Sequence, residues 1–268
     1  MGRYVNPGNV GFQVALNSTY VDKTGLLEYT NSVMGTKSAW ICNSRPRRFG
    51  KSTTVDMLVA YYSKGCDSSE LFDDLSIGKS RDYREHLNKH DVIRFDVQGF
   101  TRPAIENNRD IVKFIEQSVI DELQIEFPEV DLINETNLAE SLAKIYFQIG
   151  TRFVIVIDEW DAIIRDEQFN KKQKEDYIGF LRDMFKGSDP TEYVLLAFLT
   201  GILPVKRELS QSSLNNFDEF TMLNPFVLVP YIGFTEEEVN DLCEKNHVSF
   251  EKMKQWYDGY TLGGLHVY

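Results

Sequence analysis

The sequence has 268 residues, of which 42% are hydrophobic and 26% are charged, and these proportions are ordinary for a soluble globular protein. A chain of this length has room for one large α/β domain with a small appended subdomain. The formal net charge of −12 argues against a generally basic surface that coats nucleic acid, so we expect no direct nucleic-acid binding by this chain.

The first informative stretch in chain order spans residues 38–63. Residues 38–42 are a short apolar run of strand length, and we expect a strand over residues 39–42. After an intervening loop, apolar side chains recur at helical spacing, which predicts a helix near residues 52–63. Strand, loop and helix in this order are the context that a phosphate-binding loop requires.

The intervening loop matches the phosphate-loop pattern of Gly, four residues, Gly, Lys and Ser or Thr, except that Arg45 replaces the first glycine. Gly50 lets the backbone approach a phosphate, Lys51 brings a positive charge to the β- and γ-phosphates, and the Ser52 hydroxyl can bind Mg²⁺. Backbone N–H groups at the helix start also attract anions. The alternative is a basic turn on a solvated edge. The residues predicted to contact the nucleotide are Arg45, Pro46, Arg47, Arg48, Phe49, Gly50, Lys51, Ser52 and Thr53.

Between this loop and residue 150 the expected elements continue to alternate. We expect a short helix over residues 81–88, a strand over 92–97, and helices around 109–127 and 137–149. The strand ends before Gln98-Gly99, which makes its carboxyl end a candidate neighbour of the nucleotide. This alternation is typical of βαβ units and predicts a mostly parallel sheet flanked by helices.

Residues 153–157 form a continuous β-branched and aromatic run, typical of a strand buried on both faces of a parallel sheet. The run ends in Asp158-Glu159-Trp160-Asp161. Asp158 would hold Mg²⁺, directly or through water, and Glu159 would orient or deprotonate the attacking water. The alternative is an ordinary acidic loop, but the order and separation of this motif and the phosphate loop favour a nucleotide site.

A helix is expected near residues 172–185, and residues 193–199 form another buried-strand run that ends at Thr200-Gly201. In this class of ATPase, the strand after the acidic one often ends in a polar residue that senses the γ-phosphate. Thr200 is the candidate for that role. The alternative is a hydroxyl that closes a strand before a glycine turn.

Past about residue 230 the pattern changes. Residues 235–238 form a capping box, with Thr235 as the N-cap and Glu238 reaching back, and they open a short helix. A second helix is expected over residues 250–257. We predict a P-loop ATPase core over residues 1–230 and a small, lid-like helical subdomain over residues 231–268. The chain ends without a terminating signal, so we expect a following domain.

Cysteine content and hydropathy bear on the compartment. Only Cys42, Cys66 and Cys243 occur, and no pair has metal-ligand spacing. This sparse, odd count fits a reducing cytoplasm better than a disulfide framework. The N-terminus lacks the apolar core of a signal peptide, and no segment approaches the roughly 20 apolar residues that span a bilayer. We therefore expect a cytoplasmic protein without a membrane partner.

These motifs resemble the AAA-ATPase-like family of P-loop ATPases, found in bacteria and some microbial eukaryotes. Residues 45–52 resemble the family's phosphate loop, in which arginine at the first glycine position is normal. Further similar blocks lie at residues 20–23, 71–75, 158–161, 200–204, 213–217, 233–238 and 256–260.

The resemblance implies an ATP-binding module with Mg²⁺, and it leaves an oligomer open. Relatives often carry a PD-(D/E)XK-type nuclease-like domain after the block at residues 256–260. By analogy, residues 20–23 would flank the nucleotide base, with a structural N-terminal element as the alternative. Arg47 or Arg48 would act like an arginine finger in cis or meet a partner, unless they are simply solvated.

Two functions follow from these expectations. The first is a Mg²⁺-dependent ATPase in which Lys51 grips phosphates, Ser52 and Asp158 hold Mg²⁺, Glu159 activates water and Thr200 reads the γ-phosphate. The second is a nucleotide switch with negligible hydrolysis that regulates a C-terminal nuclease-like domain or a partner. The presence of both Asp158 and Glu159 favours hydrolysis. No motif distinguishes ATP from GTP.

Overall fold

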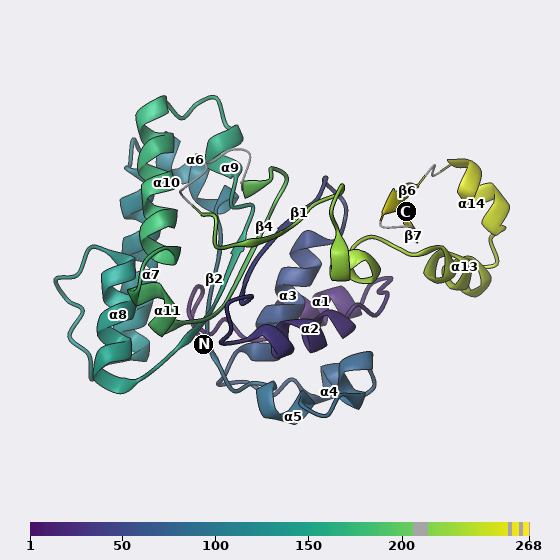
Figure 1. Ribbon diagram of the computed structural model, residues 1–268, viewed down its shortest axis with the longest axis horizontal. Helices are drawn as coiled ribbons and strands as arrows, with labels where there is room; N and C mark the ends of the chain where they lie inside the picture. Colours follow the sequence, from purple (N-terminus) through teal and green to yellow (C-terminus); the bar gives the residue numbers. More distant parts are fainter. Residues whose placement is uncertain (206–213, 257–258, 263–264, 268) are drawn as a thin grey trace.

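The computed structural model describes residues 1–205, 214–256, 259–262 and 265–267. A five-stranded sheet with the order β2-β3-β4-β1-β5 lies at its centre, and every neighbouring pair of strands is parallel (Figure 1). This arrangement confirms the predicted parallel sheet. The strands are β1 (Trp40–Ser44), β2 (Asp91–Asp96), β3 (Phe153–Asp158), β4 (Val194–Gly201) and β5 (Asp218–Phe220).

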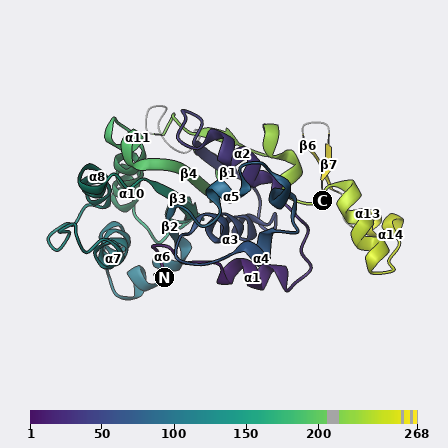
Figure 2. The same ribbon diagram turned by 90° about the horizontal axis from the view of Figure 1, so that it is seen from below.

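Helices cover both faces of the sheet (Figures 1 and 2). The face that we call the α3 side carries α1 (Val10–Leu16), α2 (Gly25–Val33), α3 (Lys51–Tyr62), α4 (Ser69–Phe72), η1 (Ser76–Lys79), α5 (Tyr83–His86) and η2 (Phe226–Tyr231). The opposite face, called the α7 side, carries α6 (Gln98–Glu106), α7 (Ile111–Glu126), α8 (Leu138–Ile149), α9 (Ala162–Arg165), α10 (Lys171–Phe185) and α11 (Asp189–Tyr193).

Alternating side chains of the strands enter two separate cores. In β3, Phe153, Ile155 and Ile157 pack on the α7 side. Val154 and Val156 pack on the α3 side. All six residues of this strand are buried, which is the physical reason why its sequence is a continuous apolar run rather than an alternating one.

Several elements differ from the sequence expectations. The predicted helices around 109–127, 137–149 and 172–185 correspond to α7, α8 and α10, with bounds shifted by one or two residues. Helices α1, α2 and α6 and strand β5 were not predicted. Helix α6 begins directly after β2 and contains Pro103, so its sequence carries a helix-breaking signal. Strand β5 has only three residues, too few for a periodic pattern, and pairs with β1.

The C-terminal segment begins with the predicted capping box. The Thr235 backbone N–H donates to Glu238 Oε2 at 2.7 Å, and the Glu238 backbone N–H donates to Thr235 Oγ1 at 3.3 Å. Helices α13 (Glu236–Lys245) and α14 (Phe250–Trp256) follow, and the expected helix end at Tyr257 lies outside the described residues. An antiparallel pair of strands, β6 (Tyr260–Leu262) and β7 (Leu265–Val267), adds to the predicted helical subdomain.

One charged contact joins this segment to the N-terminal part of the chain. The Lys23 Nζ atom lies 2.6 and 2.5 Å from the two carboxylate oxygens of Glu238 and donates to the Pro230 carbonyl oxygen at 2.8 Å. Both charged side chains are mostly buried, with 12% and 22% of their surfaces exposed. Burial lowers the pKa of Lys23, and the contact with Glu238 partly offsets that effect. The carboxylate that caps α13 therefore also docks it.

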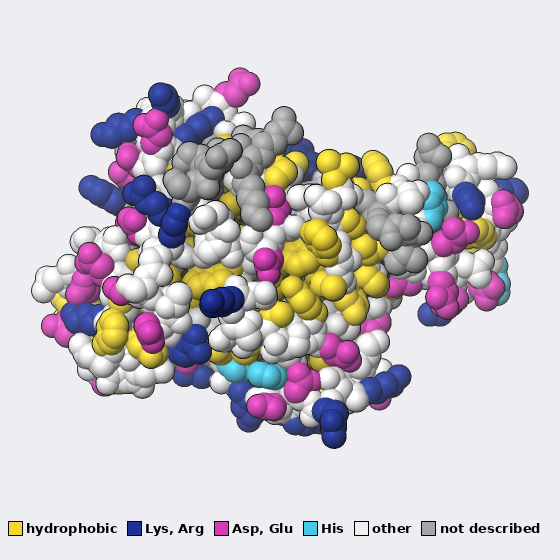
Figure 3. Space-filling model, viewed as in Figure 1, with side chains coloured by type: hydrophobic (Ala, Val, Ile, Leu, Met, Phe, Trp, Pro, Cys, Tyr) yellow, Lys and Arg dark blue, Asp and Glu magenta, His cyan; other side chains and the backbone are white. Residues whose placement is uncertain are grey.

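The surface shows charges of both signs. On the face in Figure 3, the described Lys, Arg, Asp and Glu side chains are interspersed, without a continuous basic area. Hydrophobic side chains gather near the middle of this face. No helix in the described part of the chain is long and apolar enough to cross a bilayer.

We expect Lys23→Ala to loosen the attachment of α13. Removing the amine leaves the mostly buried Glu238 carboxylate without its cationic partner, so the free energy of unfolding should fall by about 1–2 kcal/mol, less than for a fully buried pair. Urea unfolding and limited proteolysis of residues 231–235 would measure the effect. Arg102→Ala is the matched control, because its ion pair with Glu106 leaves the arginine side chain 84% exposed. Equal cleavage rates in the two variants would contradict the docking role.

Candidate functional site

The predicted phosphate loop connects β1 to the start of α3. Gly50 is the N-cap of α3 with φ of 72°, a left-handed conformation that glycine adopts without strain. No side chain of the described residues caps this helix start. The first backbone N–H groups of α3 therefore lack protein acceptors, and together with the helix dipole they form a site suited to a phosphate.

Lys51 begins α3 and turns its amine back over the loop. Its Nζ donates to the Pro46 carbonyl oxygen at 3.1 Å and lies 3.7 Å from Glu159 Oε1. Only 5% of the side chain is exposed. The amine thus lies where the loop encloses the helix start, between a carbonyl oxygen and a carboxylate.

Ser52 and Asp158 face each other from α3 and the end of β3. Burial raises the pKa of Asp158, a hydrogen bond with the Ser52 side chain lowers it in part, and the nearby Asp96 carboxylate raises it further. The net rise means that the surroundings of Asp158 stabilise its negative charge less well than water does. A bound cation would supply the missing positive charge.

Glu159 follows in a left-handed backbone conformation, with φ of 48°. Its backbone N–H donates to Asp158 Oδ1 at 3.0 Å. Such a conformation is uncommon for a residue with a Cβ, and it persists only where surrounding contacts enforce it. In this conformation the two successive carboxylates have different neighbours: Asp158 lies beside Ser52, and Glu159 lies beside Lys51.

A row of polar side chains crosses the sheet at its carboxyl edge. In the register of the sheet, Asn43 of β1 lies opposite Thr200 of β4, and Asp96 of β2 lies opposite Asp158 of β3. Asp158 and Thr200 each follow the paired residues Ile157 and Leu199. Because paired residues of parallel strands point to the same face, all four polar side chains lie on the α3 side, below the phosphate loop.

Two members of this row are fully buried without hydrogen-bond partners. Asn43 Nδ2 and Oδ1 and Thr200 Oγ1 contact no donor or acceptor among the described residues. Both residues are 0% exposed. Buried polar groups are usually paired, and an unpaired one costs about 1–3 kcal/mol, so these atoms are not explained by the fold.

Sequence reasoning missed Asn43 and Asp96. Asp96 had a signal, because it is a carboxylate at the end of a strand that was already a candidate neighbour of the nucleotide. Asn43 had none, since it directly follows the apolar run at residues 38–42 and gains its importance only from lying opposite Thr200 in the sheet.

Arg45 requires a correction. We expected it among the nucleotide contacts, but its guanidinium is fully buried and donates to the carbonyl oxygens of Ser44 at 2.9 Å and Phe220 at 2.7 Å. Its Nε and Nη2 atoms have no partner among the described residues. Burial lowers its pKa to about 10. The side chain thus ties the start of the loop to β5, and we do not include it among the proposed nucleotide contacts.

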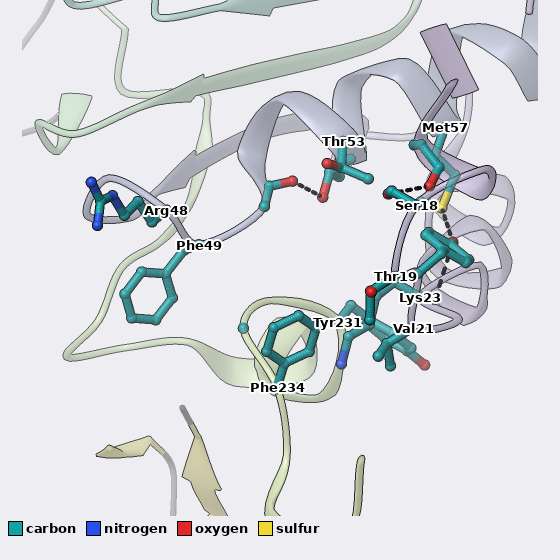
Figure 4. A pocket seen from close by; sticks show the side chains of 15 residues that line it. Ser18, Thr19, Val21, Lys23, Arg48, Phe49, Thr53, Met57, Tyr231 and Phe234 are labelled. Atoms are coloured by element: carbon teal, nitrogen blue, oxygen red, sulfur yellow. Dashed lines mark hydrogen bonds between the residues drawn. The ribbon is translucent and has the colours of Figure 1, made fainter. Parts of the chain in front are cut away.

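Two pockets lie along the loop. The first, called the phosphate pocket, has a volume of about 560 Å³. The second, called the side pocket, has a volume of about 160 Å³ and lies between the loop, the segment after α1 and the segment before α13 (Figure 4). Arg48, Gly50 and Thr53 border both pockets. The phosphate pocket is lined by Arg47, Arg48, Gly50, Lys51, Ser52, Thr53, Asp96, Gln98, Asp158 and Glu159.

Aromatic side chains border the side pocket. Figure 4 shows Phe49 and Phe234 on one side of it and Thr19 and Met57 on the other. Tyr20, from the segment that we expected near the base, also lines it. By contrast, Asp22 in the same segment turns away and accepts hydrogen bonds from the Ser76 and Thr24 backbones and hydroxyls.

The residues in the phosphate pocket fit a Mg²⁺ ion. The described residues contain no group of three or more His, Cys, Asp or Glu side chains arranged to hold a metal. Mg²⁺ bound to a nucleotide needs only one or two protein ligands besides phosphates and water. Ser52 and Asp158 would be those ligands, consistent with the raised pKa of Asp158.

Comparison with known proteins assigns the class. Residues 14–209 match the family described as "Predicted AAA-ATPase", so the chain belongs to that family. A curated relative from Azotobacter chroococcum mcd 1, named only as an uncharacterized protein in the vnfD 5′ region, is 26% identical over 253 residues. The match covers 93% of this chain and 46% of that relative, so the chain spans about half of the relative's length.

Two solved structures are also similar. The ORC2 protein of Aeropyrum pernix, in ADPNP–ADP complexes, gives a TM-score of 0.43 at 11% identity, covering 89% of this chain and 55% of that one. PCH-2 of C. elegans gives a TM-score of 0.37 at 13% identity, covering 78% of this chain and 45% of that one.

We expect Thr200→Val to raise the free energy of unfolding or leave it unchanged, because the hydroxyl that it removes is buried without a protein partner. The matched control is Thr30→Val. Thr30 is equally buried, but its hydroxyl pairs with Tyr62 Oη at 2.6 Å and with the Leu27 carbonyl oxygen, so its loss should cost about 1–2 kcal/mol. Thermal and urea unfolding would compare them. An equal loss of unfolding free energy in Thr200→Val and in the control would show that the Thr200 hydroxyl stabilises the fold.

Proposed function

We propose that this chain is a nucleotide-binding module that hydrolyses ATP with the help of Mg²⁺. The observation that carries the proposal is that Lys51, Ser52, Asp158 and Glu159 line one pocket at the uncapped start of α3. Membership of a family of predicted ATPases supports the same reaction.

The phosphates would lie against the first backbone N–H groups of α3, with Lys51 providing the positive charge. The Lys51 amine would exchange its contacts with Pro46 and Glu159 for phosphate oxygens. Mg²⁺ would neutralise phosphate charge, held by Ser52 and Asp158.

Glu159 would orient the attacking water and accept its proton. Its Oε1 atom already faces the phosphate pocket, 3.7 Å from the Lys51 amine. Thr200, near the carboxyl end of β4, would respond to the γ-phosphate. Asn43 lies opposite it on β1 and offers a second unpaired donor. Catalysis would then consist of positioning and electrostatic stabilisation, without a covalent intermediate.

The base would occupy the side pocket. Because Arg48, Gly50 and Thr53 border both pockets, one ligand can lie along the loop with its phosphates at one end and its base at the other. Phe234 and Tyr20 offer aromatic surface for a planar base.

A nucleotide switch is the second candidate, and two observations favour it. Phe49 of the phosphate loop contacts Tyr260 of β6, with ring centroids 5.7 Å apart. The side pocket is lined by the loop on one side and by Phe234, directly before α13, on another. Ligand binding there would bear directly on the C-terminal segment and, through it, on a following domain or a partner.

The first experiment compares wild type, Glu159→Gln and Lys51→Ala for ATP binding and phosphate release. Glu159→Gln should retain binding and lose about 10²–10⁴-fold in kcat, because it cannot accept a proton. Lys51→Ala should weaken binding by about ten- to a hundredfold. Lys171→Ala, on the exposed face of α10, is the control. Wild-type binding without phosphate release would favour the switch, and absence of binding would reject both functions.

Phe234→Ala tests the position of the base. Loss of one stacking surface should raise the nucleotide Kd by about five- to fiftyfold, with little change in kcat, because the side chain is remote from the reacting atoms. Phe147→Ala, at a 67% exposed position on α8, is the control. Titration with a fluorescent ATP analogue would measure both. Unchanged affinity in Phe234→Ala would contradict the placement of the nucleotide base in the side pocket.

A further inference from the structure

Arg165, the last residue of α9, bridges two carboxylates of the acidic motif. Its Nη2 atom donates to Glu159 Oε2 at 2.5 Å, and its Nε atom donates to Asp161 Oδ2 at 2.9 Å. The Arg165 side chain is only 20% exposed, so water competes weakly for these contacts. A planar guanidinium can satisfy both partners at fixed angles, which a lysine amine does less well.

Asp161 is the fixed end of this bridge. It is fully buried, and its Oδ2 atom also accepts hydrogen bonds from the backbone N–H groups of Ile202 at 3.1 Å and Leu203 at 2.8 Å. These residues directly follow the end of β4. A Cβ atom at Gly201 would lie 2.7 Å from Asp161 Oδ1, so the glycine makes room for this close packing.

Glu159 is the end of the bridge that faces the phosphate pocket. Arg165 occupies its Oε2 atom, while Oε1 points toward Lys51 at 3.7 Å. A carboxylate has about four lone-pair sites, so Oε1 keeps the capacity to accept a proton from water. Because the left-handed backbone of Glu159 needs support, a fixed partner for its carboxylate matters.

We propose that Arg165 is a positioning residue that holds the Glu159 carboxylate in the orientation needed for water activation, using Asp161 and the residues after Thr200 as its anchor. This inference rests on the proposed ATPase function. The proposal also gives Asp161 a role. As the last carboxylate of the acidic motif, Asp161 would hold Arg165 rather than a metal ion. The bridge therefore links the Glu159 carboxylate to the end of β4, which carries Thr200.

The test measures kcat, KM and nucleotide Kd for Arg165→Ala and Arg165→Lys, each in the wild-type and Glu159→Gln backgrounds. Arg165→Ala should lower kcat by about ten- to a hundredfold, as loss of an orienting partner typically does. KM and Kd should change by less than about threefold, because no binding contact is removed. Arg165→Lys should recover part of the loss. In the Glu159→Gln background, Arg165→Ala should reduce kcat no further.

Arg182→Ala is the matched control, because Arg182 on α10 pairs with the exposed Asp183 and is itself 57% exposed. A thermal unfolding curve for each variant separates misfolding from misplacement, and Arg165→Lys serves if Arg165→Ala does not fold. Unchanged or increased kcat in Arg165→Ala would overturn the inference. So would an equal loss of kcat with and without Glu159, which would indicate a structural role.

The outcomes also separate this inference from the proposed function. Turnover that requires Glu159 but not Arg165 would contradict the positioning role of Arg165 and leave the proposed ATPase function standing. Turnover that survives Glu159→Gln unchanged would remove the catalytic role of Glu159, and with it the reason for a positioning residue. A wild type without turnover would remove both.

Discussion

The register of the parallel strands is the constraint on which the candidate site depends. Asn43, Thr200, Asp158 and Asp96 come from four strands that are far apart in sequence, and they form one row only because β1, β4, β3 and β2 pair without an offset at this edge. A shift of one residue would turn a member of the row to the α7 side. Such a shift would place a polar side chain of the row in the apolar core on the α7 side, which is unfavourable without a hydrogen-bond partner.

The sequence alone predicted the parts of the site that depend on local patterns. The loop with Gly50 and Lys51 and the acidic end of β3 follow from short motifs next to buried strands. The parallel sheet follows from the alternation of strands and helices, and the strand pairing confirms it. The roles assigned to these residues remain predictions that the experiments above address.

Other features depend on distant parts of the chain and carried no local signal. Arg45 looks like a phosphate ligand in sequence, yet its partner is the carbonyl oxygen of Phe220, 175 positions away. Lys23 has its carboxylate partner 215 positions away. The three-residue strands β5, β6 and β7 are too short for periodicity to reveal them. In each case a tertiary contact, rather than a propensity, determines the outcome.

Glu238 has a further consequence for how α13 can behave. The same carboxylate closes the capping box at Thr235 and accepts the Lys23 amine. A ten-residue helix is marginally stable by itself, and its first turn depends on such a cap. Separation from Lys23 would therefore free the carboxylate that orders the first turn of α13. The Lys23 contact and the capping box therefore restrain the same carboxylate, so the docking of α13 and the order of its first turn support each other.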